Sequence, residues 1–132
     1  MIKKLVFFLP SFFIMSLIFF LSSKSSTGIG GSFTQQFVIH KTLHIFVYSL
    51  LSASLLYGFF KISTKINHQS QILSVLLTYI YGITDEIHQT FVQGREGKFT
   101  DTLFDLAGAL LGIYLYKIFR NYQINYQSNR NH

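Results

Sequence analysis

TDEIHQTFVQGREGKFTDTLFDLAGALLG, from Thr84 to Gly112, is the segment around which this chain is organised. Apolar segments long enough to enter a bilayer flank it on both sides. Carboxylates at the end of a membrane segment are costly to desolvate, so they usually mark a site or a water-filled cavity. We therefore interpret the rest of the chain as the scaffold that brings other polar residues to this segment. It holds all five acidic residues of the protein, which are Asp85, Glu86, Glu96, Asp101 and Asp105.

The composition is unlike that of a soluble domain. Charged residues make up 12% of the 132 residues and apolar residues 49%, whereas a soluble domain carries about 25% charged residues. Cysteine is absent, which excludes disulfides, thiolate nucleophiles and cysteine metal sites. The net charge of +6 does not indicate nucleic-acid binding, because the basic residues are scattered at segment ends, where they set orientation. We predict an integral membrane protein whose partner is the lipid bilayer, with no nucleic acid.

Hydropathy predicts four membrane-spanning helices, so the expected fold class is all-α, a four-helix transmembrane bundle. About 20 apolar residues in a helix cross the roughly 30 Å hydrocarbon core of a bilayer. The predicted helices occupy about residues 5–22, 42–60, 71–92 and 100–119 of a single domain over residues 1–120.

The segments outside these helices are expected to be irregular. Residues 25–36 are rich in Gly, Ser and Thr and are predicted to form a loop. Residues 121–132 are polar without periodicity and are predicted to form a mobile tail. The first apolar run follows Lys3 and Lys4, as in a cleaved signal peptide, but no A-x-A-like cleavage site follows it. We therefore favour a retained first helix.

Four spans place both ends of the chain on the same side of the membrane, and an excess of basic residues marks the cytoplasmic side. With the N-terminus in the cytoplasm, the inner segments hold seven basic residues and the outer segments four. This bias predicts an N-in, C-in orientation. The inner residues are Lys3, Lys4, Lys61, Lys65, Lys117, Arg120 and Arg130, and the outer residues are Lys24, Lys41, Arg95 and Lys98.

The alternation of spans brings polar residues from all four helices to one face of the membrane. The end of the first helix, the start of the second, the end of the third and the start of the fourth meet there, whichever way the chain is oriented. The opposite face offers little beyond lysine and arginine. The converging candidates are Ser22, Ser23, Lys24, Lys41, His44, Asp85, Glu86, His88, Gln89, Arg95, Asp101 and Asp105.

Helical spacing places several of these candidates on a common face of their helix, here called a stripe. At about 100° per residue, Lys41, His44 and Tyr48 lie on one face of the second helix. Asp101 and Asp105 share a face of the fourth helix with a G-x-x-x-G motif, Gly108 to Gly112, which allows close helix packing. Glycines against a neighbouring helix would turn both aspartates inward. That neighbour could belong to the same chain or to a dimer, so the oligomeric state stays open.

Each candidate also has a purely structural interpretation. Aspartates in the first turns of a helix can cap free amides. Lysines near a span end are often interfacial anchors, a lone histidine is more often a hydrogen-bonded interior group, and Arg95 can pair with Glu96 on the surface. The convergence of these residues, rather than any one of them, favours a site.

The pattern D-E-x-x-Q-x-F-x-x-G-R, followed by D-x-x-x-[N/D]-x-x-G-x-x-x-G, resembles the VanZ-like family of small bacterial membrane proteins. It runs here from Asp85 to Gly112. The family also tends to have a serine pair that ends helix one, matched by Ser22 and Ser23, and a K-x-x-H-x-x-x-Y pattern on helix two. Lys41, His44 and Tyr48 match the second of these patterns.

Two departures from the family pattern lie on the same face. Members usually have glutamine where this chain has Lys24, and asparagine where it has Asp105. The two charges could offset each other as an ion pair, or they could change the ligand. The resemblance implies a four-helix protein of the bacterial cell membrane and a link to teicoplanin resistance, and it implies no known reaction.

Three classes of function follow from these residues. The first is a multi-pass envelope protein that binds an envelope component or glycopeptide, with Lys41, His44 and Arg95 gripping a phosphate or carboxylate. The second is an intramembrane enzyme on a lipid-linked or phosphate-bearing substrate. Glu86 or Asp85 would be its base, and His44 or Arg95 would stabilise the anion. A carrier ranks third, because four short helices are a small scaffold for alternating access.

No pattern in the sequence fixes a nucleophile or a metal, so we predict no cofactor and assign no metal site. The carboxylates could nevertheless hold a hard cation such as Mg²⁺, which prefers oxygen ligands.

Overall fold

In a computed structural model that describes residues 2–25, 32–95 and 97–130, the chain is helical, with no strand in these ranges. This confirms the all-α prediction. A short helix α1 (Ile2–Leu5) and a 3-10 turn η1 (Val6–Phe8) precede the long helices. The long helices are α2 (Leu9–Ser22), α3 (Phe33–Ser63), α4 (His68–Gln89) and α5 (Phe99–Arg130).

Helix α3 begins at Phe33, so the prediction of a loop over residues 25–36 and a helix start at residue 42 was wrong for residues 33–41. A capping box starts the helix: the Ser32 hydroxyl accepts from the Gln35 amide, and the Gln35 side chain accepts from the Ser32 amide. The Gly- and Ser-rich composition of this region concealed the signal. Asn67 and Ser70 form the same box at the start of α4.

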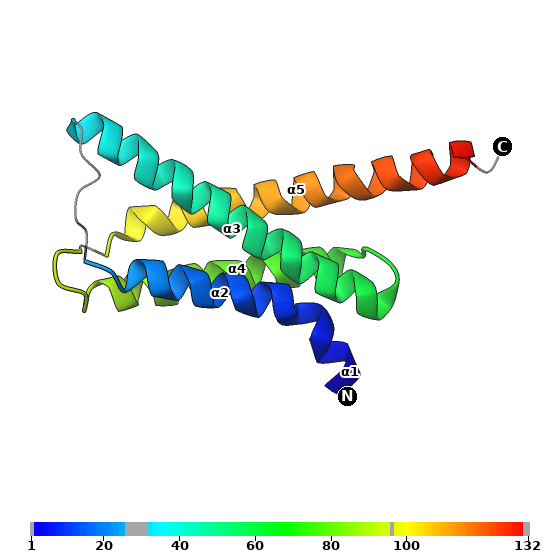
Figure 1. Cartoon of the computed structure of the whole chain (residues 1–132), viewed down its shortest axis with the longest axis horizontal. Helices are drawn as coiled ribbons and strands as arrows, with labels where there is room; N and C mark the ends of the chain where they lie inside the picture. Colours follow the sequence, from blue (N-terminus) through cyan, green and yellow to red (C-terminus); the bar gives the residue numbers. More distant parts are fainter. Residues whose placement is uncertain (1, 26–31, 96, 131–132) are drawn as a thin grey trace.

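Helix α5 continues to Arg130, so residues 121–130 of the predicted mobile tail are helical. No glycine or proline follows Gly112 to stop the helix. Contacts one turn apart also stabilise it, since Arg120 donates to Gln123 and the rings of Tyr122 and Tyr126 stack. Its 32 residues span about 48 Å at 1.5 Å per residue, and α5 projects past the other helices in Figure 1.

Figure 1 shows the end of α2, the start of α3, the end of α4 and the start of α5 at one end of the molecule. Helices α3 and α5 therefore run in the same direction, and their contact is the most extensive between any two helices. The G-x-x-x-G motif lies in this contact. A Cβ on Gly108 would lie 2.5 Å from the Ile45 carbonyl oxygen, and one on Gly112 would overlap the carbonyl of Ser49. Within this chain, both glycines pack α5 against α3.

The described helices are apolar outside and largely polar inside. On α4 the buried residues are small or polar, while the opposite face is exposed and aliphatic. A soluble helix shows the reverse pattern, because exposed apolar faces of this size are rare in water. Helices α3, from Thr34, and α5 are each long and apolar enough to cross a membrane, and Val6–Ser22 is a shorter apolar helix. The buried face of α4 comprises Ser70, Ser74, Thr78, Gly82, Asp85, Glu86 and Gln89, and Ile72, Leu73, Leu76, Leu77 and Ile80 are exposed.

Candidate functional site

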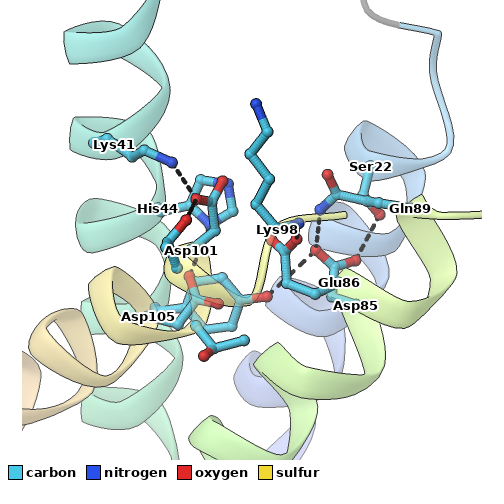
Figure 2. A network of polar contacts seen from close by, with 12 residues as sticks. Ser22, Lys41, His44, Asp85, Glu86, Gln89, Lys98, Asp101 and Asp105 are labelled. Atoms are coloured by element: carbon cyan, nitrogen blue, oxygen red, sulfur yellow. Dashed lines mark hydrogen bonds and ion pairs between the residues drawn. The ribbon is translucent and has the colours of Figure 1, made fainter. Parts of the chain in front are cut away.

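Asp85 is held by hydrogen-bond donors from three helices. The Ser22 hydroxyl of α2 donates to Oδ1 at 2.6 Å. The Gln89 amide of α4 donates to Oδ2 at 2.9 Å (Figure 2). The Tyr48 hydroxyl of α3 donates to the same oxygen at 3.4 Å. All three donors are uncharged, and the carboxylate is buried. Asp85 therefore joins α2, α3 and α4, and its acceptor capacity is largely used.

Glu86, the next residue, faces the start of α5. The backbone amide of Lys98 donates to its Oε2 at 2.8 Å, while Oε1 is buried and accepts no hydrogen bond from the described residues. Gly97 fits against the backbone of Glu86, since a Cβ there would overlap the Glu86 carbonyl. The connection to α5 is thus fastened to the end of α4, and one carboxylate oxygen is left without a donor.

The stripes on α3 and α5 meet as two pairs. Lys41 forms an ion pair with Asp101, and Nδ1 of His44 donates to Oδ1 of Asp105 at 2.7 Å (Figure 2). The sequence separations of 60 and 61 residues reflect two parallel helices in constant register. Asp105 is fully buried and fits beside Gly82, because a Cβ there would lie 2.8 Å from its Oδ2.

The ion pair considered between Lys24 and Asp105 is not formed. The Lys24 ammonium lies 4.5 Å from the ring centroid of Phe20, whereas Asp105 bonds to His44 inside the bundle. The two departures from the family pattern therefore do not compensate each other directly.

Arg95 has a structural role that the sequence analysis did not anticipate. Its Nε donates to the Lys24 carbonyl and its Nη2 to the Leu21 carbonyl, both at 3.0 Å. The last carbonyls of a helix lack partners within the helix, so Arg95 satisfies the end of α2 from the loop after α4. The absence of a glycine at this helix end is the one sequence signal for such a donor. The alternative partner Glu96 lies outside the described residues.

The two serines at the end of α2 have different surroundings. Ser22 bonds to buried Asp85, but the exposed Ser23 hydroxyl lies 3.0 Å from Nε2 of His88. The His88 ring stacks on Phe19, with the ring centroids 4.6 Å apart. Ser23 and His88 therefore lie outside the buried network.

Two adjoining cavities open at this end of the bundle. The first, about 300 Å³ and here named the inner cavity, lies between α2 and α3. Most of its surface is apolar and comes from side chains such as Leu21 and Val47, although polar residues, among them Asp85, also line it. The second, about 530 Å³ and here named the outer cavity, is lined by Lys41, Lys98 and Asp101. Both are also lined by His40, His44, Gln89 and Arg95. Sequence reasoning did not single out His40 and Lys98 for the site. The spacing of four residues between His40 and His44 could have found the first, because it places both on one helix face.

Comparison with known proteins identifies the family. The model of the VanZ/LLP1 family matches residues 2–120, which confirms the resemblance found in the sequence. Searches of the curated proteins and of the solved structures gave no match. Together with two helices long and apolar enough to cross a membrane, the family match indicates a membrane protein. The chain belongs to the VanZ/LLP1 family.

Proposed function

We propose that the chain is a multi-pass protein of the bacterial cell membrane, with four spans and both termini in the cytoplasm. The apolar exterior of α4 and the apolar helix Val6–Ser22 support two spans beyond α3 and α5. The basic residues support the orientation, because more of them lie at the end remote from the cavities. The polar end would then face outward, towards the cell envelope.

We propose further that this polar end binds an anionic envelope component that also has an apolar part. The observation that carries the proposal is the pair of adjoining cavities. Lys41, Arg95 and Lys98 line the outer one beside two histidines, which suits a phosphate or carboxylate. The inner one is mainly apolar and lies between two apolar helices, which suits a lipid chain. A lipid-linked phosphate combines both features.

Binding of such an anion would use cations that already contact a carboxylate or backbone carbonyls. Lys41 is partly exposed and paired with Asp101 at the rim, so a phosphate can share or replace that contact. The Lys41 ammonium also lies 5.2 Å from the ring centroids of Phe37 and Phe104, which guide its position. Arg95 would attract the anion through its positive charge while its hydrogen bonds to the end of α2 stay in place.

The proposal predicts that the purified protein in lipid nanodiscs binds farnesyl phosphate more tightly than farnesol, which has the same chain without the anion. Lys41→Gln and Lys98→Gln should each weaken binding of the phosphate about tenfold, since a hydrogen bond to a charged group contributes about 1.5–3 kcal/mol. Titration calorimetry measures the affinities.

Lys65→Gln, a lysine at the opposite end, is the matched control and should bind like the wild type. Equal binding of farnesol and farnesyl phosphate would exclude an anion site. Titration of teicoplanin in the same preparation tests the glycopeptide version: competition with farnesyl phosphate would support it, and independent or absent binding would exclude it at this site.

A second candidate function, catalysis on a phosphate-bearing envelope substrate, is favoured by Oε1 of Glu86, which has no hydrogen-bond partner among the described residues. Asp85 already accepts three hydrogen bonds and Arg95 is engaged at the end of α2, so Glu86 and His44 are the better candidates for a base and an anion-stabilising group. A new lipid or phosphate product in the same incubations would distinguish catalysis from binding.

A further inference from the structure

We infer that His44, Glu86 and Asp101 form a binding site for one divalent metal ion of the zinc type. They come from α3, α4 and α5, and one ligand atom from each lies within 4.8 Å of the others. Figure 2 shows the three side chains converging at the polar end of the bundle. This inference goes beyond the proposed anion binding and does not depend on it.

His44 is already oriented as a metal-binding histidine would be. Its Nδ1 lies 2.7 Å from Oδ1 of Asp105 and donates to it, and in the neutral imidazole this leaves Nε2 with the lone pair that a metal requires. Metal-ligating histidines almost always donate their other ring nitrogen to a carboxylate or carbonyl, which fixes the tautomer and the ring position. Asp105, buried beside Gly82, fills this supporting role.

Glu86 provides the independent sign of a ligand. Its side chain is only 6% exposed, and its Oε1 has no hydrogen-bond donor among the described residues. A buried carboxylate oxygen without a partner is costly. The donor to its other oxygen is the uncharged backbone amide of Lys98, and the three donors to neighbouring Asp85 are uncharged too. A cation at this point would compensate the buried negative charge.

Asp101 can complete the site without losing its present partners. Lys41 and Thr100 both contact its Oδ1, which leaves Oδ2 for a metal. Ligand atoms lie about 2.1 Å from Zn²⁺, and hence about 3–4 Å from one another. The three groups therefore need to close by about 1 Å, a shift that side-chain rotation can supply.

The donor set indicates the class of ion and the form of the site. One imidazole with two carboxylates suits Zn²⁺ or Mn²⁺, whereas Ca²⁺ takes six to eight oxygen ligands. Three protein ligands leave a coordination position open. His44 and Asp101 both line the outer cavity, so the open position would face that cavity. A water or a phosphate oxygen could occupy it.

The test uses the full-length protein in nanodiscs, treated with chelator and titrated with Zn²⁺, Mn²⁺ and Mg²⁺ in the absence of any added anionic ligand. Wild type should bind one Zn²⁺ per chain, measured by calorimetry and metal analysis, and its unfolding temperature should rise on binding. Glu86→Gln should weaken Zn²⁺ binding at least tenfold. It keeps the side-chain shape and an oxygen to accept from the Lys98 amide, so the fold should persist.

His44→Gln and Asp101→Asn should show the same loss, while His88→Gln is the matched control and should bind like the wild type. His88 lies at the same end but outside the cluster. Absence of stoichiometric Zn²⁺ and Mn²⁺ binding to wild type would overturn the inference, as would equal binding by wild type and Glu86→Gln. Because farnesyl phosphate is absent, this failure is separate from failure of the proposed anion binding.

Discussion

Gly112→Leu is expected to prevent normal assembly of the bundle and to cause the largest loss of folded protein among single substitutions. A Cβ at this position overlaps the carbonyl of Ser49, which belongs to the backbone of α3 and cannot rotate away. Overpacking a tight contact typically costs about 1–3 kcal/mol, and a leucine adds three further carbons. The measurements are the yield of monodisperse protein after detergent extraction and the unfolding temperature.

Gly58→Ala is the matched control for this substitution. Its Cβ would meet the ring of Phe8, which is a side chain able to shift, rather than the backbone of another helix. It should lower the unfolding temperature less than Gly112→Ala, the size-matched change in the tight contact. Wild-type stability of Gly112→Leu would contradict the close packing of α3 and α5 at this position.

Asp85→Leu is expected to have the second largest effect, because it removes the acceptor shared by three helices. Ser22, Tyr48 and Gln89 would each lose a buried partner. Ser22 keeps its hydrogen bond to the Phe19 carbonyl, so the cost falls mainly on Tyr48 and Gln89. An unsatisfied buried polar group costs about 1–3 kcal/mol, so the sum is several kcal/mol. The unfolding temperature in detergent should fall sharply, and α2 should become sensitive to protease.

Asp85→Asn should be far milder than the leucine substitution. The asparagine oxygen can still accept from Ser22, and its amide can donate to the Gln89 oxygen once the Gln89 amide turns over. The stability is therefore expected to decrease from the wild type to Asp85→Asn and further to Asp85→Leu. A leucine variant more stable than the asparagine variant would show that this network does not hold the helices together.

The sequence was informative where a residue's role depends on its position along one helix. Spacing alone assigned Lys41 and His44 to one stripe and Asp101 and Asp105 to another, and the structure pairs these stripes in register. Hydropathy located all four long helices because each contains an apolar block. It missed the polar ends of α3 and α5, since a capping box or the lack of a stop signal, rather than hydropathy, sets those ends.

Roles that depend on how one helix faces its neighbours could not be predicted from the sequence. Asp85 and Glu86 are adjacent and about 100° apart around α4. Asp85 accepts from three donors, whereas Glu86 has one oxygen without a donor in the part of the chain that the structure describes. Arg95 reaches back over 70 residues to the end of α2. Both contacts are set by how α2 and α4 lie against each other, and no local pattern records that.

The measurement that most directly tests a four-span bundle with an outward polar end is single-cysteine labelling in intact cells. The chain has no cysteine, so each introduced thiol is the only one present. Ser25→Cys and Gln93→Cys follow α2 and α4 at the polar end, and Lys65→Cys lies in the connection at the other end; all three positions are exposed. The reagent is a maleimide that cannot cross the membrane.

Ser25→Cys and Gln93→Cys should be labelled in intact cells, and Lys65→Cys only after the membrane is permeabilised. Labelling of Lys65→Cys alone in intact cells would reverse the orientation and place the polar end in the cytoplasm. Labelling of Ser25→Cys and Gln93→Cys from opposite sides would contradict the bundle itself, because the residues that build the site could not then meet on one face.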